Sequence, residues 1–328
     1  MPDSSPPPAR LLDRQVNPRG IAWIVGLLIT YAALFLPISR IIRHDWPLEN
    51  FTVFRVQYFW LFTLVALVCL IARQRIPAAL FALVAIWQGA TFIPLYFGGP
   101  PHPLPPKQLR LFSSNVLYEN KQYAQLFEAV KEADPDIVLL AEFDNDWAAE
   151  IAPLQAEYPY SQMKPLGGAF GIACFSRIPL DTLTIEHSDQ GDAPYIRASL
   201  TIEGQPLTIY GVHLKPPIDQ TYLRERNAEL NELAPLISAR TTPTLLIGDL
   251  NLTSDSGVFG RFLKQTGLHD SRAGYGIQAS WPKWVPLAKI AIDHCLISPE
   301  IVIVDRHLGP DIGSDHRPLI VDLAISSP

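Results

Sequence analysis

Six apolar segments of this 328-residue chain end or begin at side chains that can bind a metal ion or move a proton. One such residue would mean little, because Asn, Asp and His are ordinary turn and cap residues. Six strand ends that carry them indicate a site, since active sites of α/β proteins collect at strand ends and in the loops there. The residues are Asn115, Glu142, His213, Asp249, Asn251, Asp293, Asp315 and His316.

Five of these residues offer oxygen atoms. The carboxylates of Glu142, Asp249 and Asp315 are hard ligands, and the amides of Asn115 and Asn251 add neutral ones. Carboxylate and amide oxygens suit Mg²⁺ or Mn²⁺, whereas a closed zinc site would need cysteines and histidines. The sequence therefore predicts a magnesium or manganese site.

The remaining three residues can handle protons. His213 and His316 can each gain or lose a proton near neutral pH. Asp293 can hold one imidazole in its useful tautomer. A metal ion, two imidazoles and a spare acid together match phosphoryl hydrolysis, in which one group activates water and another protonates the leaving oxygen.

The elements that would position these residues follow residue 108. Apolar segments typical of buried strands alternate with amphipathic segments of helical spacing, and Asp219 is a candidate N-cap for a helix at 219–238. Residues 195–202 and 206–214 are predicted to pair across a short turn, and so are residues 292–298 and 301–308. Strands and helices both alternate and cluster, which predicts an α/β fold with a mixed sheet.

Three apolar segments fill the N-terminal third, at residues 20–38, 56–72 and 76–97. A membrane-spanning helix needs roughly 20 such residues, so we expect three transmembrane helices. Buried helices of a soluble core are the alternative. A cleaved signal peptide fits less well, because the first segment is long and two more follow.

The arginines predict the orientation of these spans. Three precede the first segment and two lie between the second and the third, which places both positions in the cytoplasm by the positive-inside rule. Three more arginines between the first two segments weaken the bias. Three spans that start inside put the C-terminal domain on the periplasmic or extracellular side of an inner or plasma membrane.

The chain thus divides into four parts. Residues 1–19 form a Pro/Ser-rich cytoplasmic tail that is expected to be disordered, residues 20–97 a three-helix membrane anchor, residues 98–108 a Pro-rich linker and residues 109–328 the catalytic domain. Three cysteines make no disulfide framework, although the sequence leaves a Cys174–Cys295 bridge open.

Seven motifs of the C-terminal part resemble the endonuclease/exonuclease/phosphatase superfamily. This superfamily includes pancreatic-type DNases, abasic-site endonucleases, neutral sphingomyelinases and inositol-polyphosphate 5-phosphatases. The motifs cover about two-thirds of the chain in the order typical of the superfamily: "SSNV", "DPDIVLLAE", "GIACFSRIP", "YGVHL", "IGDLN", "IDHCLIS" and "GSDHRPL". The resemblance implies a DNase I-like four-layer sandwich of two mixed β-sheets flanked by helices, with the site at one edge.

The resemblance also implies roles for the strand-end residues. Asn115 and Glu142 would hold the divalent metal with Asp315 beside it. Asp249 and Asn251 would orient or deprotonate the attacking water. His316, paired with Asp293, would contact the phosphoryl oxygen or act as the base, and His213 would be the second imidazole.

Three further residues remain open between a functional and a structural role. Arg197 is a candidate phosphate contact or a surface arginine on a strand. Trp281 and Trp284 would stack on a substrate base, lie against the membrane or pack within their loop.

His213 lacks the carboxylate partner that pancreatic-type DNases supply, because no acid lies between residues 158 and 171.

The substrate is a phosphate ester of a lipid, a nucleic acid or a small molecule, and no protein partner is predicted. Residues 104–328 carry 18 Lys/Arg and 28 Asp/Glu, a net charge of -10, which does not favour tight duplex binding. A nuclease outside the cytoplasm and a lipid phosphodiesterase are alternatives for a membrane-tethered enzyme. A non-catalytic membrane scaffold fits less well, because no site position is lost.

Overall fold

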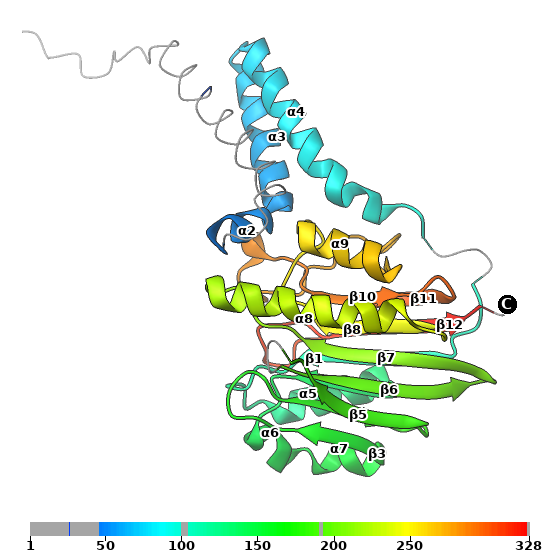
Figure 1. Ribbon diagram of the computed structural model, residues 1–328. Coiled ribbons are helices and arrows are strands. Elements are labelled where there is room, and N and C mark those ends of the chain that lie inside the picture. The colour runs from blue at the N-terminus through cyan, green and yellow to red at the C-terminus, as the bar shows by residue number, and fades with distance from the viewer. Residues whose placement is uncertain (1–25, 27–45, 100–103, 190–192, 327–328) are drawn as a thin grey trace, which may run out of the picture.

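Two six-stranded β-sheets form the centre of the protein (Figure 1). The computed structural model describes residue 26 and residues 46–99, 104–189 and 193–326. The first sheet has the order β11 (Ile301–Leu308), β12 (Leu319–Ile325), β1 (Leu109–Asn115), β2 (Ile137–Ala141), β4 (Ile172–Ser176) and β3 (Tyr160–Lys164). The second has the order β5 (Thr182–His187), β6 (Pro194–Ile202), β7 (Gln205–His213), β8 (Thr244–Asp249), β10 (Asp293–Ile297) and β9 (His269–Asp270).

Both sheets are mixed, as the sequence predicts. β1 runs parallel to β2, and β7 runs parallel to β8, while every other neighbouring pair is antiparallel. The two parallel pairs place two strand ends side by side in each sheet. Asn115, His213 and Asp249 stand at three of these ends, and Glu142 follows the fourth directly.

Three apolar cores hold four layers together. The largest core lies between the sheets and consists of strand residues alone, such as Leu111, Leu245 and Val321. A second core packs the outer face of the first sheet against α5 (Tyr123–Ala133), α6 (Asn145–Glu150) and α7 (Ala152–Glu157). A third packs the second sheet against α8 (Gln220–Ser238) and α9 (Gly257–Thr266). The expected sandwich of two mixed sheets flanked by helices is confirmed.

The local sequence explains the burial pattern of two strands and the start of one helix. Along β6 burial alternates, because Ile196, Ala198 and Leu200 face the inner core while the residues between them face outward. β8 is buried along its whole length and reads as one apolar segment. The predicted cap of α8 is confirmed, since Asp219 accepts hydrogen bonds from the amides of Thr221 and Tyr222.

The predicted pairing of residues 292–298 with 301–308 is wrong. β10 pairs with β8 and β9 in the second sheet, whereas β11 pairs with β12 in the first. β10 is occupied on both edges, so the chain crosses to the opposite sheet after residue 298. There Ile301 and Ile303 join the inner core. A short turn between two apolar segments predicts a hairpin only if the first strand still has an unpaired edge for the second strand to join.

From residue 46 to the linker, the structure describes α2 (Trp46–Thr52), α3 (Arg55–Ile71), α4 (Arg75–Phe92) and a 3-10 turn η1 (Ile93–Tyr96). α3 and α4 lie side by side and project away from the sandwich (Figure 1). Within the described residues, one continuous segment, Arg75–Tyr96, is long and apolar enough to cross a membrane, and α3 has 17 residues. The predicted first span and the tail lie outside the described residues, apart from residue 26. Three transmembrane helices therefore stay a prediction.

The three cysteines are free and buried. Cys174 and Cys295 both belong to the inner core, where burial raises the pKa of each thiol to about 12. Neither thiol is therefore a nucleophile at neutral pH.

Replacing an inner-core leucine tests the role of the sandwich interior. Leu111→Ala deletes a fully buried side chain and is expected to lower the free energy of unfolding by about 2–5 kcal/mol. Denaturant unfolding of the detergent-solubilised chain, followed by tryptophan fluorescence, measures this loss. Leu236→Ala removes a leucine that is 48% exposed and should cost about 0.5 kcal/mol or less. Equal losses would contradict the assignment of the core.

Candidate active site

Three neighbouring strands of the second sheet bring three site residues into one row. His213 is in register with Asp249, and Asp249 is in register with Asp293. Partners directly opposite each other in a sheet lie on the same face. Because Ile209 of β7 belongs to the inner core, the alternation of side chains also turns His213 toward the first sheet.

Gly248 permits this row. Its φ of +141° is unusual for a residue with a side chain, and a Cβ atom there would lie 1.9 Å from the carbonyl oxygen of Val212. Any other residue would push β7 and β8 apart one step before His213 and Asp249. The glycine of the "IGDLN" motif is thus required by close strand packing.

The first sheet supplies the facing residues. Asn115 is in register with Ala141, so Glu142 follows immediately beside it. The hydroxyl of Ser314 donates to the carbonyl oxygen of Asn115 at 2.8 Å, which fixes the turn that carries Asp315. The "SDH" motif is therefore attached to the end of β1.

The side chain of Asn115 joins the two sheets. Its Nδ2 donates to Glu142 Oε1 at 2.9 Å and to Asp249 Oδ2 at 3.2 Å. Glu142 Oε2 also accepts from the amide of Tyr118 at 3.3 Å. Burial raises the pKa of Glu142 even though these hydrogen bonds oppose the shift, and the charge of Asp315 adds to it.

His316 forms a buried pair with Asp293. Its Nδ1 lies 2.8 Å from Asp293 Oδ2, and its Nε2 lies 3.6 Å from Asp249 Oδ2. Burial opposes protonation of the imidazole, but the carboxylates of Asp293 and Asp249 outweigh it and raise the pKa of His316 to about 10. His316 is therefore a cation at neutral pH, with Asp293 as its counter-ion.

His213 has the opposite character. Its Nε2 lies 3.7 Å from Asp249 Oδ2 and 4.0 Å from Glu142 Oε1. Burial and the nearby charge of His316 lower its pKa to about 4, so its imidazole is neutral. The ring of Phe170 stacks on it with centroids 5.9 Å apart. Among the described residues no carboxylate pairs with its Nδ1, which agrees with the absence of an acid in the preceding loop.

Asp249 stands between the two histidines. Complete burial raises its pKa to about 7, a shift that the charge of His316 reduces. A carboxyl group that titrates near neutral pH can both hold and release a proton. Asp249 Oδ1 accepts from the amide of Asn251 at 2.9 Å, and Asn251 Nδ2 donates to the carbonyl oxygen of Leu214 at 2.8 Å. Asn251 is thereby fixed against the loop that follows His213.

Two sets of side chains could bind a cation. Ligand atoms of Asp249, Asp293 and His316 lie within 4.8 Å of one another. In this set, however, His316 already neutralises Asp293. The carboxylates of Glu142 and Asp315 suit a divalent ion better, because neither pairs with a lysine or arginine among the described residues, and His213, 4.0 Å from Glu142 Oε1, is neutral. Asn115 could add its Oδ1, which here accepts from the amide of Leu117 at 3.0 Å.

Comparison with known proteins places the domain. A family model, the Endonuclease/Exonuclease/phosphatase family, matches residues 110–316, which is more than half of the chain. The chain belongs to this family. A search of the curated proteins found no match.

Solved structures of low sequence identity share the fold of this family member. An endonuclease/exonuclease/phosphatase from Beutenbergia cavernae DSM 12333 is 18% identical with a TM-score of 0.55, over 67% of this chain and 72% of that one. The human Nocturnin catalytic domain with bound sulfate anion is 17% identical with a TM-score of 0.56, over 68% and 96%. D. rerio TDP2 complexed with single strand DNA product is 17% identical with a TM-score of 0.55, over 66% and 98%.

The structure brings together all of the sequence-predicted site residues of this family domain except Arg197. Arg197 lies on the outward face of β6 with its side chain 53% exposed, 3.9 Å from Glu186. The alternation of β6 that turns Ile196 inward turns Arg197 away from the site. No contact of Arg197 with the site residues occurs in the described part of the chain.

Two residues support the site in ways that the sequence did not predict. Trp281, whose role the sequence left open, donates from Nε1 to Asp315 Oδ2 at 2.7 Å and so packs against the site. Ser280 contacts Asp293 and helps to lower its pKa, alongside His316 and against burial. Only their position shortly before Asp293 could have indicated them. Trp284, in contrast, is 59% exposed.

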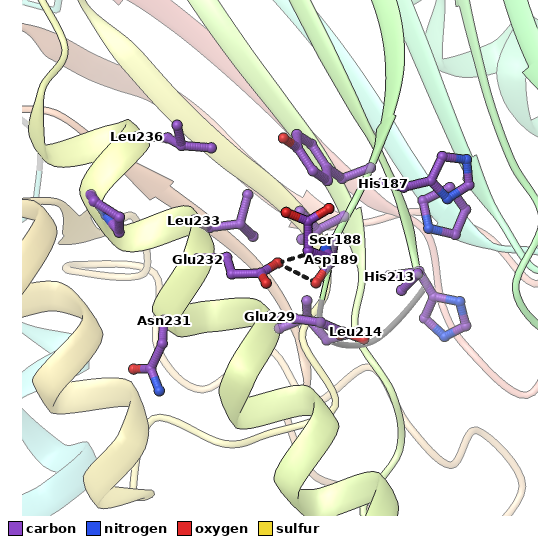
Figure 2. A pocket seen from close by; sticks show the side chains of 15 residues that line it. His187, Ser188, Asp189, His213, Leu214, Glu229, Asn231, Glu232, Leu233 and Leu236 are labelled. Atoms are coloured by element: carbon purple, nitrogen blue, oxygen red, sulfur yellow. Dashed lines mark hydrogen bonds between the residues drawn. The ribbon is translucent and has the colours of Figure 1, made fainter.

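A pocket of about 450 Å³ lies behind His213, on the other face of the second sheet. Figure 2 shows it between α8 and the strand that carries His213. Burial raises the pKa of Glu229 in its wall to about 7. His187 and Glu232 also line it, but of the predicted site residues only His213 does. The strand-end cluster is therefore the candidate active site.

Removing the counter-ion of His316 tests the buried pair. The folded-state pKa of His316 lies above its ordinary value of 6.5, so the pair stabilises the fold fully below about pH 6.5 and loses this effect as the pH rises toward 10. Asp293→Asn is expected to lower the melting temperature most at pH 6, with a smaller difference from the parent chain at pH 9.5. Thermal unfolding across this range measures it. A difference that stays constant or grows with pH would contradict the assignment.

Proposed function

We propose that the protein is a membrane-tethered, divalent-metal-dependent phosphoesterase that hydrolyses phosphodiester or phosphomonoester bonds. The observation that carries this proposal is the placement of Asp249 between a cationic and a neutral imidazole, beside an oxygen-rich set of ligands. Family membership supports the reaction class.

The residues fit a bound Mg²⁺ or Mn²⁺. Asn115, Glu142 and Asp315 would hold the ion, and burial of Glu142 near Asp315 leaves negative charge that a cation would neutralise. When bound, the ion supplies charge neutralisation at the phosphate. The Trp281 indole keeps Asp315 in place for this role.

The protein side chains divide the proton chemistry. Asp249 is the group best placed to orient a water molecule and take its proton, because its pKa lies near neutrality. His316 is protonated and can donate from Nε2 to a phosphoryl oxygen, while Asp293 holds the imidazolium. The charge of His316 argues against its alternative role as the base. His213 is neutral, so its Nε2 can form one hydrogen bond to the substrate or to the water, as donor or acceptor according to its tautomer.

The chain supports a substrate at a membrane surface. The loop after Trp281 exposes Trp284 (59%), Val285 (43%) and Leu287 (87%). Gln57 at the start of α3 donates to the carbonyl oxygen of Lys289 at 2.9 Å, so this loop lies at the base of the apolar α3–α4 pair. Together with the net charge of -10 for residues 104–328, this favours a lipid or lipid-linked phosphate ester. A nuclease is the second candidate, because the similar TDP2 structure holds a single strand DNA product.

The proposed location is an inner or plasma membrane, with the catalytic domain on the periplasmic or extracellular side. One contact agrees with α3 and α4 both crossing the membrane, as the three-span arrangement requires. α2 follows the first predicted span, and its Trp46 Nε1 donates to the carbonyl oxygen of Pro217 in the catalytic domain. In a three-span anchor this loop and the C-terminal domain lie on the same side.

Asp249→Asn tests the proposed chemistry. We expect hydrolysis to fall by about 10²-fold or more, the usual contribution of a general base, and to disappear with a chelator. The panel comprises bis(4-nitrophenyl) phosphate, sphingomyelin, phosphatidylinositol phosphates and plasmid DNA with Mg²⁺. Asp146→Asn, an exposed residue whose side chain pairs with Lys121, is the matched control. Full activity of Asp249→Asn on every substrate would refute the proposal.

A C-terminal fusion tests the orientation. An alkaline phosphatase reporter, which is active only after export, should be active when it follows residue 328. A cytoplasmic reporter such as green fluorescent protein should stay dark after Sec-dependent export. The reverse pattern would place the domain in the cytoplasm.

A further inference from the structure

The short helix α2 lies outside the family-matched region but contacts Arg226, the arginine of α8 that binds the loop after Asp249. We call this loop, residues 251–256, the catalytic loop. α2 precedes the matched residues 110–316, yet its Glu49 lies against α8 of the catalytic domain. Arg226 of α8 is 1% exposed, and its Nη2 donates to Glu49 Oε1 at 2.5 Å. Within the described residues, Glu49 provides the carboxylate that pairs with this arginine.

The other end of the arginine reaches the catalytic loop. Arg226 Nη1 donates to the carbonyl oxygen of Asn251 at 3.0 Å. Asn251 has a φ of +49°, in the left-handed region that costs free energy for any residue but glycine. Its amide holds Asp249 Oδ1. Arg226 thus fastens the turn that aims Asp249.

Burial makes this arginine dependent on Glu49. A buried guanidinium without a counter-ion is costly, and the Glu49 side chain is itself only 13% exposed. Glu49 Oε1 also accepts from the hydroxyl of Ser256 at 3.1 Å, at the far end of the same loop. A single carboxylate oxygen therefore ties Arg226 to both ends of residues 251–256.

α2 also holds the loop that follows His213. Trp46 Nε1 and Asn50 Nδ2 donate to the carbonyl oxygen of Pro217 at 2.6 and 3.0 Å. The same loop begins at Leu214, whose carbonyl oxygen accepts from the Asn251 side chain. The loops that follow His213 and Asp249 therefore both contact α2.

We propose that α2 is part of the catalytic unit and that Glu49 is a positioning residue, which acts through Arg226 on the Asp249–Asn251 turn. This inference rests on the proposed phosphoesterase function. It assigns to the N-terminal segment a role beyond anchoring, since among the described residues this segment supplies the carboxylate that pairs with Arg226. Loss of that charge loosens the turn and misplaces Asp249, an error to which catalysis is sensitive.

Glu49→Gln in the full-length chain tests this role. With bis(4-nitrophenyl) phosphate and Mg²⁺ we expect kcat to fall about tenfold, and KM to change less than about twofold, because positioning affects the transition state more than binding. Glu49→Asp keeps the charge and should stay within about threefold of the parent kcat. Glu132→Gln, the same change at an exposed position of α5, is the matched control and should leave both constants unaltered.

A second readout separates positioning from stability and from the proposed function. Hydrogen exchange of the amides of residues 250–256 should speed up about tenfold in Glu49→Gln while exchange in β1 stays unchanged. A lower melting temperature with unchanged kcat and unchanged exchange would overturn the inference. If the parent chain hydrolyses neither phosphodiesters nor phosphomonoesters, the proposed function fails, and the exchange result alone decides on the link from Glu49. If Glu49→Gln does not fold, Trp46→Phe takes its place, because it removes the indole donor to Pro217. This variant must lower kcat about threefold. An unchanged kcat would overturn the inference.

Discussion

The hydrogen bonds of one amide unite the two halves of the site. Asn115 belongs to the first sheet, and its Nδ2 donates both to Glu142 beside it and to Asp249 of the second sheet. Neither sheet carries a complete set of residues, since the proposed metal ligands lie mainly on one and the proposed proton-handling groups mainly on the other. The site therefore exists only when the inner core brings the sheets together. Packing far from the chemistry, along the length of that core, sets the distance between the two halves.

The second governing feature is the removal of water from charged groups. Asp249, Asp293, His213 and His316 are all nearly inaccessible to solvent. In this environment each charge is decided by its neighbours, which is why two histidines 3.6 and 3.7 Å from the same oxygen carry different charges. His316 has Asp293 behind it, whereas His213 has the ring of Phe170. Asp249 therefore lies between one charged imidazole, that of His316, and one neutral imidazole, that of His213.

Most strands and most site residues could be predicted from the sequence, because buried strands appear as apolar segments whose polar ends mark the site. The strands β1, β2, β7 and β8 read directly as apolar segments, and their polar ends named the site. Long-range pairing left no such record, so β10 and β11 were placed together although they lie in different sheets. The outward turn of Arg197 depends on alternation along β6, which residue type alone did not reveal. The contact of Glu49 with Arg226 joins residues 177 positions apart, and no local pattern marks it.

The backbone conformation of Glu142 and Asn251 lowers the stability of the fold in order to place their side chains in the site. Both adopt left-handed backbone angles, with φ of +57° and +49°, which glycine would adopt without penalty. Each residue therefore costs the native state of order 1 kcal/mol for the sake of its side chain. Selection for thermal stability alone would favour glycine at these two positions and would remove a proposed metal ligand and an amide proposed to orient water. A more heat-resistant descendant of this protein that lost activity would be expected to have changed here first.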